Sequence, residues 1–354
     1  MFVYVGTYTG PGKAEGIYVF RMDERSGTLA PVQTVSGVDS PSFLTLHPNR
    51  RTLYAVNESG DAGGGVSAFS VESGSGRLAP LGKQSSHGTS PCYVSVDPTG
   101  RCALVANYGN GIVSVFPLQP DGSLGQASHV VQHVGSSTNR RQAGPHAHSI
   151  VIDPSGQFVL SADLGCDRVF VYRLDAGAGT LSPHDIPYAQ VSSGAGPRHI
   201  AFHPNQRLAF VNNEIDSSVT SFTWDAERGV LSVNDTRSTL PEDFTGNNST
   251  AQVTVHPNGA FVYVSNRGHD SIAVFSVDRE RGKLTPLGHV SSGGKTPRNF
   301  NLDPSGTFLH AANQNSGNIV TFRVDPASGL PSPAGHTTAV PAPVCVLFAP
   351  SDSA

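Results

Sequence analysis

The side chains best suited to proton transfer and anion binding stand at two fixed distances from a recurring proline. They are His148, Arg198 and Arg298 at six residues before it, and Glu58, Tyr108, Glu214, Arg267 and Gln314 at ten residues after it. Histidine and carboxylate groups can move protons, and guanidinium groups can stabilise negative charge that develops on an oxygen. If the two positions meet in the fold, these residues form one acid–base and anion-binding site.

The proline belongs to a repeated tag of the form (His/Asp)-Pro-x-(Gly/polar). The tag begins at residues 47, 97, 153, 203, 256 and 303, and a weaker copy, APSD, begins at 349. A strand-like segment precedes each tag, and three more follow, such as FVYVSNR, SIAVFSVD and GKLTP after the tag at 256. Four strands in about 50 residues are typical of a propeller blade, and no segment shows the 3.6-residue period of a helix.

The two chain ends complement one another. The C-terminal VCVLFAP reads as a first strand with nothing after it, whereas MFVYVGTYTG, GIYVFRMD and GTLAPVQ read as second, third and fourth strands. The sequence therefore predicts an all-β, seven-bladed propeller with four antiparallel strands per blade. Residues 1–354 form a single domain, and strands from both ends share one blade.

The same repeat predicts where the polar residues point. The start of each first strand and the end of each second strand lie at one face of the ring, so their variable residues converge on the central mouth. A third, nearly uniform position, held by Asn in five blades, is interpreted as a turn cap. The tag histidines, including His203, are turn residues. His199 follows Arg198 on a strand and is expected to point the other way, between blades.

Composition limits the classes of partner. The formal net charge is −4, without a basic block, which argues against nucleic acid. No apolar run approaches a membrane span, and the N-terminus lacks the features of a signal peptide, so a cytoplasmic protein is expected. The four cysteines lack metal-type spacing and are interpreted as buried thiols, with a Cys92–Cys102 bridge as an alternative. Nothing indicates an obligate partner, so we expect a monomer or a weak homo-oligomer.

Several stretches together resemble one family. They are GPHAHSIVIDPSG at 144–156, GPRHIAFHPN at 196–205, VNNEIDSSV at 211–219, VSNRGHDSIAVF at 264–275 and TPRNFNLDPSG at 296–306. These resemble the seven-bladed propeller lactonases, which include bacterial propeller-type 6-phosphogluconolactonases and a fungal carboxymuconate lactonising enzyme. The resemblance covers essentially the whole chain. One departure is Tyr93, where many relatives carry His.

The resemblance implies a catalytic set of one His, two Arg and one Glu around the axis. These fall on His148, Arg198, Arg267 and Glu214, while Arg298 matches a family position near the pocket. His146, two residues before His148, is the alternative histidine. Glu58, Tyr108 and Gln314 are predicted to contact substrate or line the rim.

The activity predicted from this set is hydrolysis of a small-molecule sugar lactone, 6-phosphogluconolactone above all. Glu214 is expected to act as general base and His148 as general acid, with Arg198 and Arg267 stabilising the oxyanion. Arg298 and Arg267 could hold a phosphate, and no metal or organic cofactor is expected. The alternatives are a carboxymuconate-type cycloisomerase and a non-catalytic binding propeller.

Overall fold

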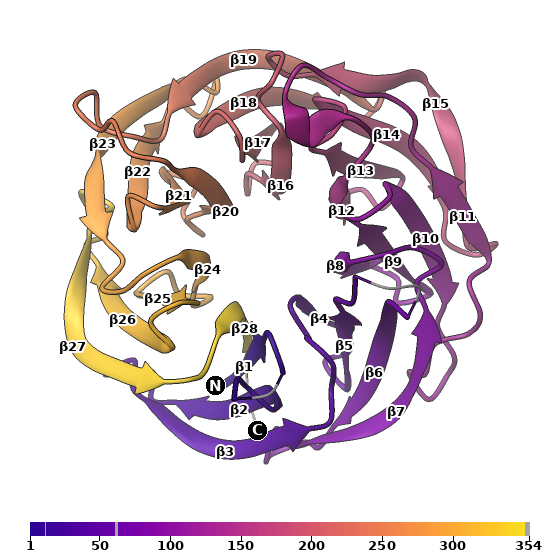
Figure 1. Cartoon of the computed structure of the whole chain (residues 1–354), viewed down its shortest axis with the longest axis horizontal. Coiled ribbons are helices and arrows are strands. Elements are labelled where there is room, and N and C mark those ends of the chain that lie inside the picture. The colour runs from indigo at the N-terminus through magenta and orange to yellow at the C-terminus, as the bar shows by residue number, and fades with distance from the viewer. Residues whose placement is uncertain (11, 61–62, 351–354) are drawn as a thin grey trace.

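Seven four-stranded antiparallel sheets stand around a central axis in the computed structural model, which describes residues 1–10, 12–60 and 63–350 (Figure 1). In every sheet the first strand of the repeat lies nearest the axis and the fourth lies at the rim. The predicted seven-bladed β-propeller is therefore confirmed. The weak tag at 349 is only partly covered, because residues 351 and 352 lie outside the described residues.

The strands fall into four concentric sets. The innermost strands are β4 (Leu44–Leu46), β8 (Pro91–Val96), β12 (Ala147–Ile152), β16 (Pro197–Phe202), β20 (Ser249–Val255), β24 (Pro297–Leu302) and β28 (Pro343–Ala349). The second strands are β1 (Phe2–Thr7), β5 (Thr52–Asn57), β9 (Cys102–Asn107), β13 (Phe158–Asp163), β17 (Leu208–Asn213), β21 (Phe261–Arg267) and β25 (Phe308–Asn313). The third strands are β2 (Gly16–Met22), β6 (Gly65–Val71), β10 (Ile112–Pro117), β14 (Arg168–Asp175), β18 (Ser218–Asp225), β22 (Ser271–Val277) and β26 (Asn318–Val324). The outer strands are β3 (Leu29–Ser36), β7 (Leu78–Ser85), β11 (His129–Gln132), β15 (Thr180–Gln190), β19 (Val230–Ser238), β23 (Leu284–Ser291) and β27 (Pro331–Ala339).

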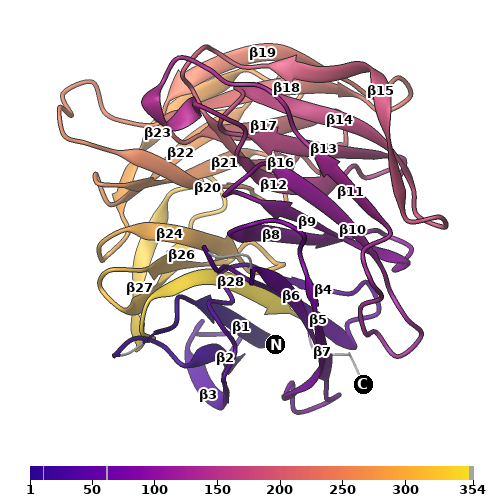
Figure 2. The same cartoon turned by 45° about the vertical axis from the view of Figure 1, so that its right-hand side comes forward.

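The ring closes through a blade built from both ends of the chain. Strand β28 pairs antiparallel with β1, with Val3 opposite Phe348 and Val5 opposite Val346. Strands β28 and β1 lie side by side in this blade in the two views (Figures 1 and 2). The shared blade predicted from the sequence is confirmed, and this pairing covers the inner edge of β1.

Burial follows the position of each strand within its blade. Strands β5, β9, β13 and β17 are buried at every residue, because both faces of a blade are covered by its neighbours. The outer strands consist mostly of exposed and partly buried residues. The core is therefore a ring of apolar layers between blades, which holds the inner strands rigidly around the axis.

The proline tags form the turns between the first and second strands, as predicted. His203 contacts the carbonyl oxygen of Gly259 in the next blade through Nε2 at 2.8 Å, and Asp97 accepts backbone N–H bonds from Thr99, Arg101 and Cys102. None of the helices in the described ranges has the length and apolar character needed to cross a membrane.

Candidate active site

A β-bulge at the start of the inner strands directs side chains toward the axis. In β12, Ala147 pairs with Asp163 and Ser149 pairs with Ala162, which leaves His148 as the extra residue. The same irregularity occurs at Cys92, Arg198, Arg298 and Val344. A bulge bends the strand and re-aims the extra side chain. The offset of six residues before each proline therefore corresponds to a bulge that repeats around the ring.

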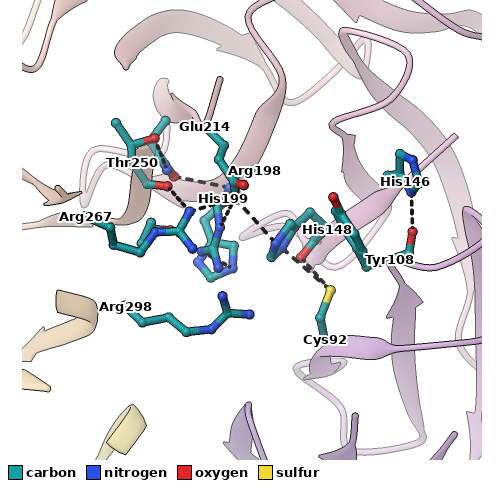
Figure 3. Close-up of polar contacts among 12 residues, drawn as sticks. Cys92, Tyr108, His146, His148, Arg198, His199, Glu214, Thr250, Arg267 and Arg298 are labelled. Carbon is teal, nitrogen blue, oxygen red and sulfur yellow. Dashed lines mark hydrogen bonds and ion pairs between the residues drawn. The ribbon is translucent and has the colours of Figure 1, made fainter. Parts of the chain in front are cut away.

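Glu214 is the centre of the charged cluster. Its Oε2 lies 2.8 Å from Nε of Arg198 and 2.9 Å from Nη2 of Arg267 (Figure 3). Its Oε1 lies 2.5 Å from Nη2 of Arg141. The Glu214 side chain is only 7% exposed. Residues from three places in the sequence thus neutralise one buried carboxylate.

These partners control ionisation. Burial opposes the charged form of Glu214, but Arg267 and Arg198 outweigh it and hold the pKa of this carboxyl well below its usual range. Burial, together with Arg267 and Arg298, lowers the pKa of Arg198 to about 9. At neutral pH both the Glu214 carboxylate and the Arg198 guanidinium are therefore charged. Breaking this pair would leave an uncompensated buried charge.

His148 lies between Glu214 and Cys92. Its Nε2 is 3.8 Å from Oε2 of Glu214, and its Nδ1 is 3.6 Å from Sγ of Cys92. Burial and the nearby Arg198 and His199 lower the pKa of His148 well below its usual value. Burial raises the pKa of the Cys92 thiol. The site therefore contains a neutral imidazole and a neutral thiol beside an ionised carboxylate.

A second acidic–basic group stands across the axis. The hydroxyl of Tyr8 donates to Glu58 at 2.9 Å, and the guanidinium of Arg298 lies 5.1 Å from the centre of the Tyr8 ring. Nη2 of Arg298 lies 3.8 Å from Oε2 of Glu58. Burial opposes the charge of Arg298, but Tyr8 and Glu58 outweigh it and raise the pKa of this guanidinium. In Figure 3 the Arg298 guanidinium points toward the cluster of Arg198, His199 and His148.

Arg267 has unused hydrogen-bonding capacity. Its Nη2 donates to the carbonyl oxygen of Thr250 at 2.8 Å and contacts Glu214, but its buried Nε has no hydrogen-bond partner among the residues that the structure describes. A buried N–H without an acceptor is costly. An oxygen of a bound molecule could satisfy this donor.

The other predicted residues take different places. Tyr108 faces His148 edge-on at 5.3 Å and stacks on His146 at 4.7 Å. Nδ1 of His146 contacts the carbonyl oxygen of Tyr108 at 2.6 Å, and the ring lies away from Glu214 (Figure 3). Of the two candidate histidines, only His148 adjoins the charged cluster. Gln314 lies outside this cluster, in a neighbouring hollow of about 420 Å³ that Tyr8 also lines.

Other expectations concern the surroundings of the site. Asn266 makes the expected bond from side chain to backbone, donating to the carbonyl oxygen of Thr239 at 2.7 Å, but this bond anchors the connection between β19 and β20 and does not cap the turn after β21. All four cysteines are buried and free, as predicted, so the alternative Cys92–Cys102 bridge is not formed.

The expectation for His199 was wrong. Its ring lies 5.3 Å from His148 and 5.1 Å from Tyr93, which belong to other blades and meet His199 only at the axis. Its Nε2 contacts Nη1 of Arg198 at 3.0 Å, and its Nδ1 contacts Gln252 at 2.7 Å. The bulge at Arg198 interrupts strict alternation, so neighbouring residues can both face inward.

Arg141 was not predicted from the sequence. This residue belongs to the short 3-10 helix η1 (Arg140–Gln142), in the connection between β11 and β12. It lies outside the repeat, so no offset from a proline could identify it. The unusual length of this connection was the available signal.

Comparisons with known proteins identify the family of this fold. The family described as "Lactonase, 7-bladed beta-propeller" matches residues 2–348. The chain is 39% identical over 346 residues to a 6-phosphogluconolactonase of Bacillus subtilis, covering 98% of this chain and 97% of that protein. The solved structure of a periplasmic gluconolactonase from Pseudomonas aeruginosa superposes with a TM-score of 0.93 at 33% identity, covering 99% of each chain. The chain belongs to the seven-bladed β-propeller lactonase family.

Proposed function

We propose that this lactonase hydrolyses a phosphorylated sugar lactone, 6-phosphogluconolactone, to 6-phosphogluconate, and that it needs no metal or organic cofactor. The observation that carries the proposal is the charge of the mouth. Four guanidinium groups, those of Arg141, Arg198, Arg267 and Arg298, surround only the two carboxylates of Glu58 and Glu214. An excess of two positive charges, in a chain of net charge −4, suits a doubly charged substrate. The Bacillus relative carries the name of this activity.

We assign the transfer of protons to His148. A base must be unprotonated and not fully occupied by cations, and His148 is neutral whereas Glu214 is held by three arginines. In this proposal Nε2 takes a proton from the attacking water and passes it to the ring oxygen that leaves. Glu214 stays ionised and stabilises the imidazolium 3.8 Å away. The four residues of the sequence prediction are kept, but the base is His148 rather than Glu214.

Arg267 and Arg298 are proposed to bind the reacting lactone. The unpartnered Nε of Arg267 and the inward-pointing guanidinium of Arg298 can donate to the carbonyl oxygen as negative charge develops there. Arg198 is only 2% exposed, and its donors contact Glu214, His199 and the carbonyl oxygen of Ala251. It therefore acts as a positioning residue that fixes the carboxylate.

The test is hydrolysis of freshly prepared 6-phosphoglucono-δ-lactone above its spontaneous rate, with and without a chelator. We expect acceleration that the chelator does not change. Loss of activity with chelator would contradict the metal-free mechanism. If the folded protein does not accelerate this reaction but converts a muconate-type diacid, the cycloisomerase alternative replaces the hydrolase.

We also propose a cytoplasmic location, which is supported by the four free, buried cysteines. A related structure is described as periplasmic, so the two compartments must be distinguished by fractionation of the source cells. Recovery in a periplasmic extract would overturn this assignment without affecting the proposed reaction.

A further inference from the structure

The connection between β11 and β12 carries a charged side chain over the site. It spans residues 133–146, and η1 lies within it, near β14 and β18 in Figure 1. Arg141 in η1 contacts Glu214, which follows β17, and Tyr108, which follows β9. Both of these residues adjoin His148 of β12. Any substrate held against His148 is therefore close to Arg141.

The backbone of this connection is anchored independently of the site. The carboxylate of Asp167 accepts hydrogen bonds from the Oγ of Ser137, the Nε2 of Gln142, and the backbone N–H groups of Gly194 and Gly196. A second anchor is the buried contact between Nδ1 of His133 and Oδ2 of Asp163, which lie 2.7 Å apart. These contacts fix the backbone of the connection, so the Arg141 side chain can change its conformation while the backbone stays in place.

The contacts of Arg141 can be exchanged at little cost. Its side chain is 40% exposed, unlike those of Arg198 and Arg267, which are 2% and 13% exposed. It binds Oε1 of Glu214, whereas Arg198 and Arg267 bind Oε2, so the carboxylate keeps two cationic partners if Arg141 leaves. Because the Arg141 side chain is partly exposed, water or a bound anion can compete with Glu214 for its guanidinium.

We propose that Arg141 distinguishes phosphorylated from uncharged sugar lactones. In the free protein Glu214 and Tyr108 hold its guanidinium at the rim. When substrate binds, the guanidinium turns to the phosphoryl group, while the lactone ring lies deeper, against Arg267 and Arg298. A guanidinium at the wet rim suits a dianion, which keeps part of its hydration and gains bidentate hydrogen bonds. This inference rests on the proposed function and names the residue that reads the phosphate.

The test compares 6-phosphoglucono-δ-lactone with glucono-δ-lactone in Arg141→Ala and Arg141→Lys. We expect Arg141→Ala to raise KM for the phosphorylated lactone by about 10- to 100-fold more than it raises KM for the plain lactone. Arg141→Lys should recover part of the loss, because it keeps the charge without the planar fork. Arg140→Ala is the matched control, since Arg140 is an exposed neighbour in the same short helix.

Two results would overturn the proposal. One is an equal loss on both lactones in Arg141→Ala, which would mean that Arg141 acts only through Glu214. The other is an equal loss in Arg140→Ala, which would indicate a general effect of charge. Calorimetric binding of 6-phosphogluconate and gluconate separates this inference from the proposed function. If the wild type hydrolyses neither lactone, the function fails. If the wild type binds the phosphorylated acid selectively and Arg141→Ala abolishes this selectivity, the role of Arg141 is still supported. If the selectivity persists in Arg141→Ala, that role is refuted.

Discussion

At the scale of single residues, the site depends on one buried carboxylate shared among cations. Glu214 is nearly inaccessible, yet it is ionised because Arg198, Arg267 and Arg141 surround it. Desolvating a carboxylate is costly unless it is paired and hydrogen-bonded. The same arginines need the carboxylate, since without it their charges would repel one another. Charge and geometry at this point are therefore interdependent.

Replacing this carboxylate by an amide tests that interdependence. Glu214→Gln should lower kcat/KM for the lactone by about 10²- to 10⁴-fold, because the arginines lose their anchor and the imidazolium loses its counter-charge. Steady-state kinetics measure the effect, with thermal melting to verify the fold. Glu242→Gln, at an exposed acid in the loop after β19, is the control. Full activity in folded Glu214→Gln would eliminate Glu214 from the mechanism.

The ionisation of His148 predicts a pH dependence. Folding lowers its pKa below the unfolded value of about 6.5, so the native state favours the neutral ring. Its contribution to stability is complete above about pH 6.5 and is lost as the pH falls. If neutral His148 is the base, kcat/KM should stay level between about pH 6.5 and 8 and fall only well below 6.5. A pH–rate profile measures this. Activity that declines as the pH rises through 6 to 7 would instead favour protonated His148 as general acid.

At the scale of elements, a repeated irregularity rather than regular strand geometry aims the site. The bulges at His148, Arg198 and Arg298 turn residues of the inner strands toward the axis. Glu58 and Glu214 follow the ends of second strands, directly after the buried Asn57 and Asn213. Two structural positions, repeated seven times, thus supply most of the functional groups.

The hairpins at the rim of the blades depend on close packing. Gly229, between β18 and β19, has φ +68°, and a Cβ there would lie 2.4 Å from the Phe158 ring of the preceding blade. Gly229→Ala should destabilise the protein by about 2–4 kcal/mol, from backbone strain and from steric overlap. Gly74→Ala is the matched control, because φ is +82° there but nothing lies within 4 Å of the added Cβ. Urea unfolding of both variants should show the larger loss in the free energy of unfolding for Gly229→Ala. Equal losses would mean that the Phe158 side chain moves aside without a cost in free energy.

At the scale of the whole molecule, the ring is held shut by the pairing of β28 with β1. Deleting residues 343–354 removes the buried Val344, Val346 and Phe348 and exposes the inner edge of β1. We expect Tm to fall by more than about 10 °C, or the protein to become insoluble, because several core side chains and a strand pairing are lost together.

Calorimetry or a thermal-shift assay measures this effect. Deleting only residues 351–354 leaves β28 whole and separates the loss of the strand from the loss of chain length. An unchanged Tm in the longer deletion would show that the shared blade does not hold the ring closed.

The number of blades, the way the ring closes and most of the site follow from the sequence, because each blade repeats the same local pattern. A proline turn at a fixed interval places equivalent residues at equivalent points of a symmetric ring. His148, Arg198, Glu214 and Arg267 could therefore be grouped although they lie far apart in the chain. Glu58 and Arg298 occupy the same two repeated positions, and in the structure they lie together with Tyr8.

Only the tertiary structure decided what departs from that pattern. Arg141 lies in a connection that no repeat constrains, and its position depends on anchoring by Asp167 and Asp163. The inward place of His199 depends on a bulge that alternation along a strand does not predict. The protonation states of His148 and Glu214 depend on burial and on the distances to charges from several blades. Periodicity is a local property that a sequence displays, whereas desolvation and charge coupling exist only after the ring has closed.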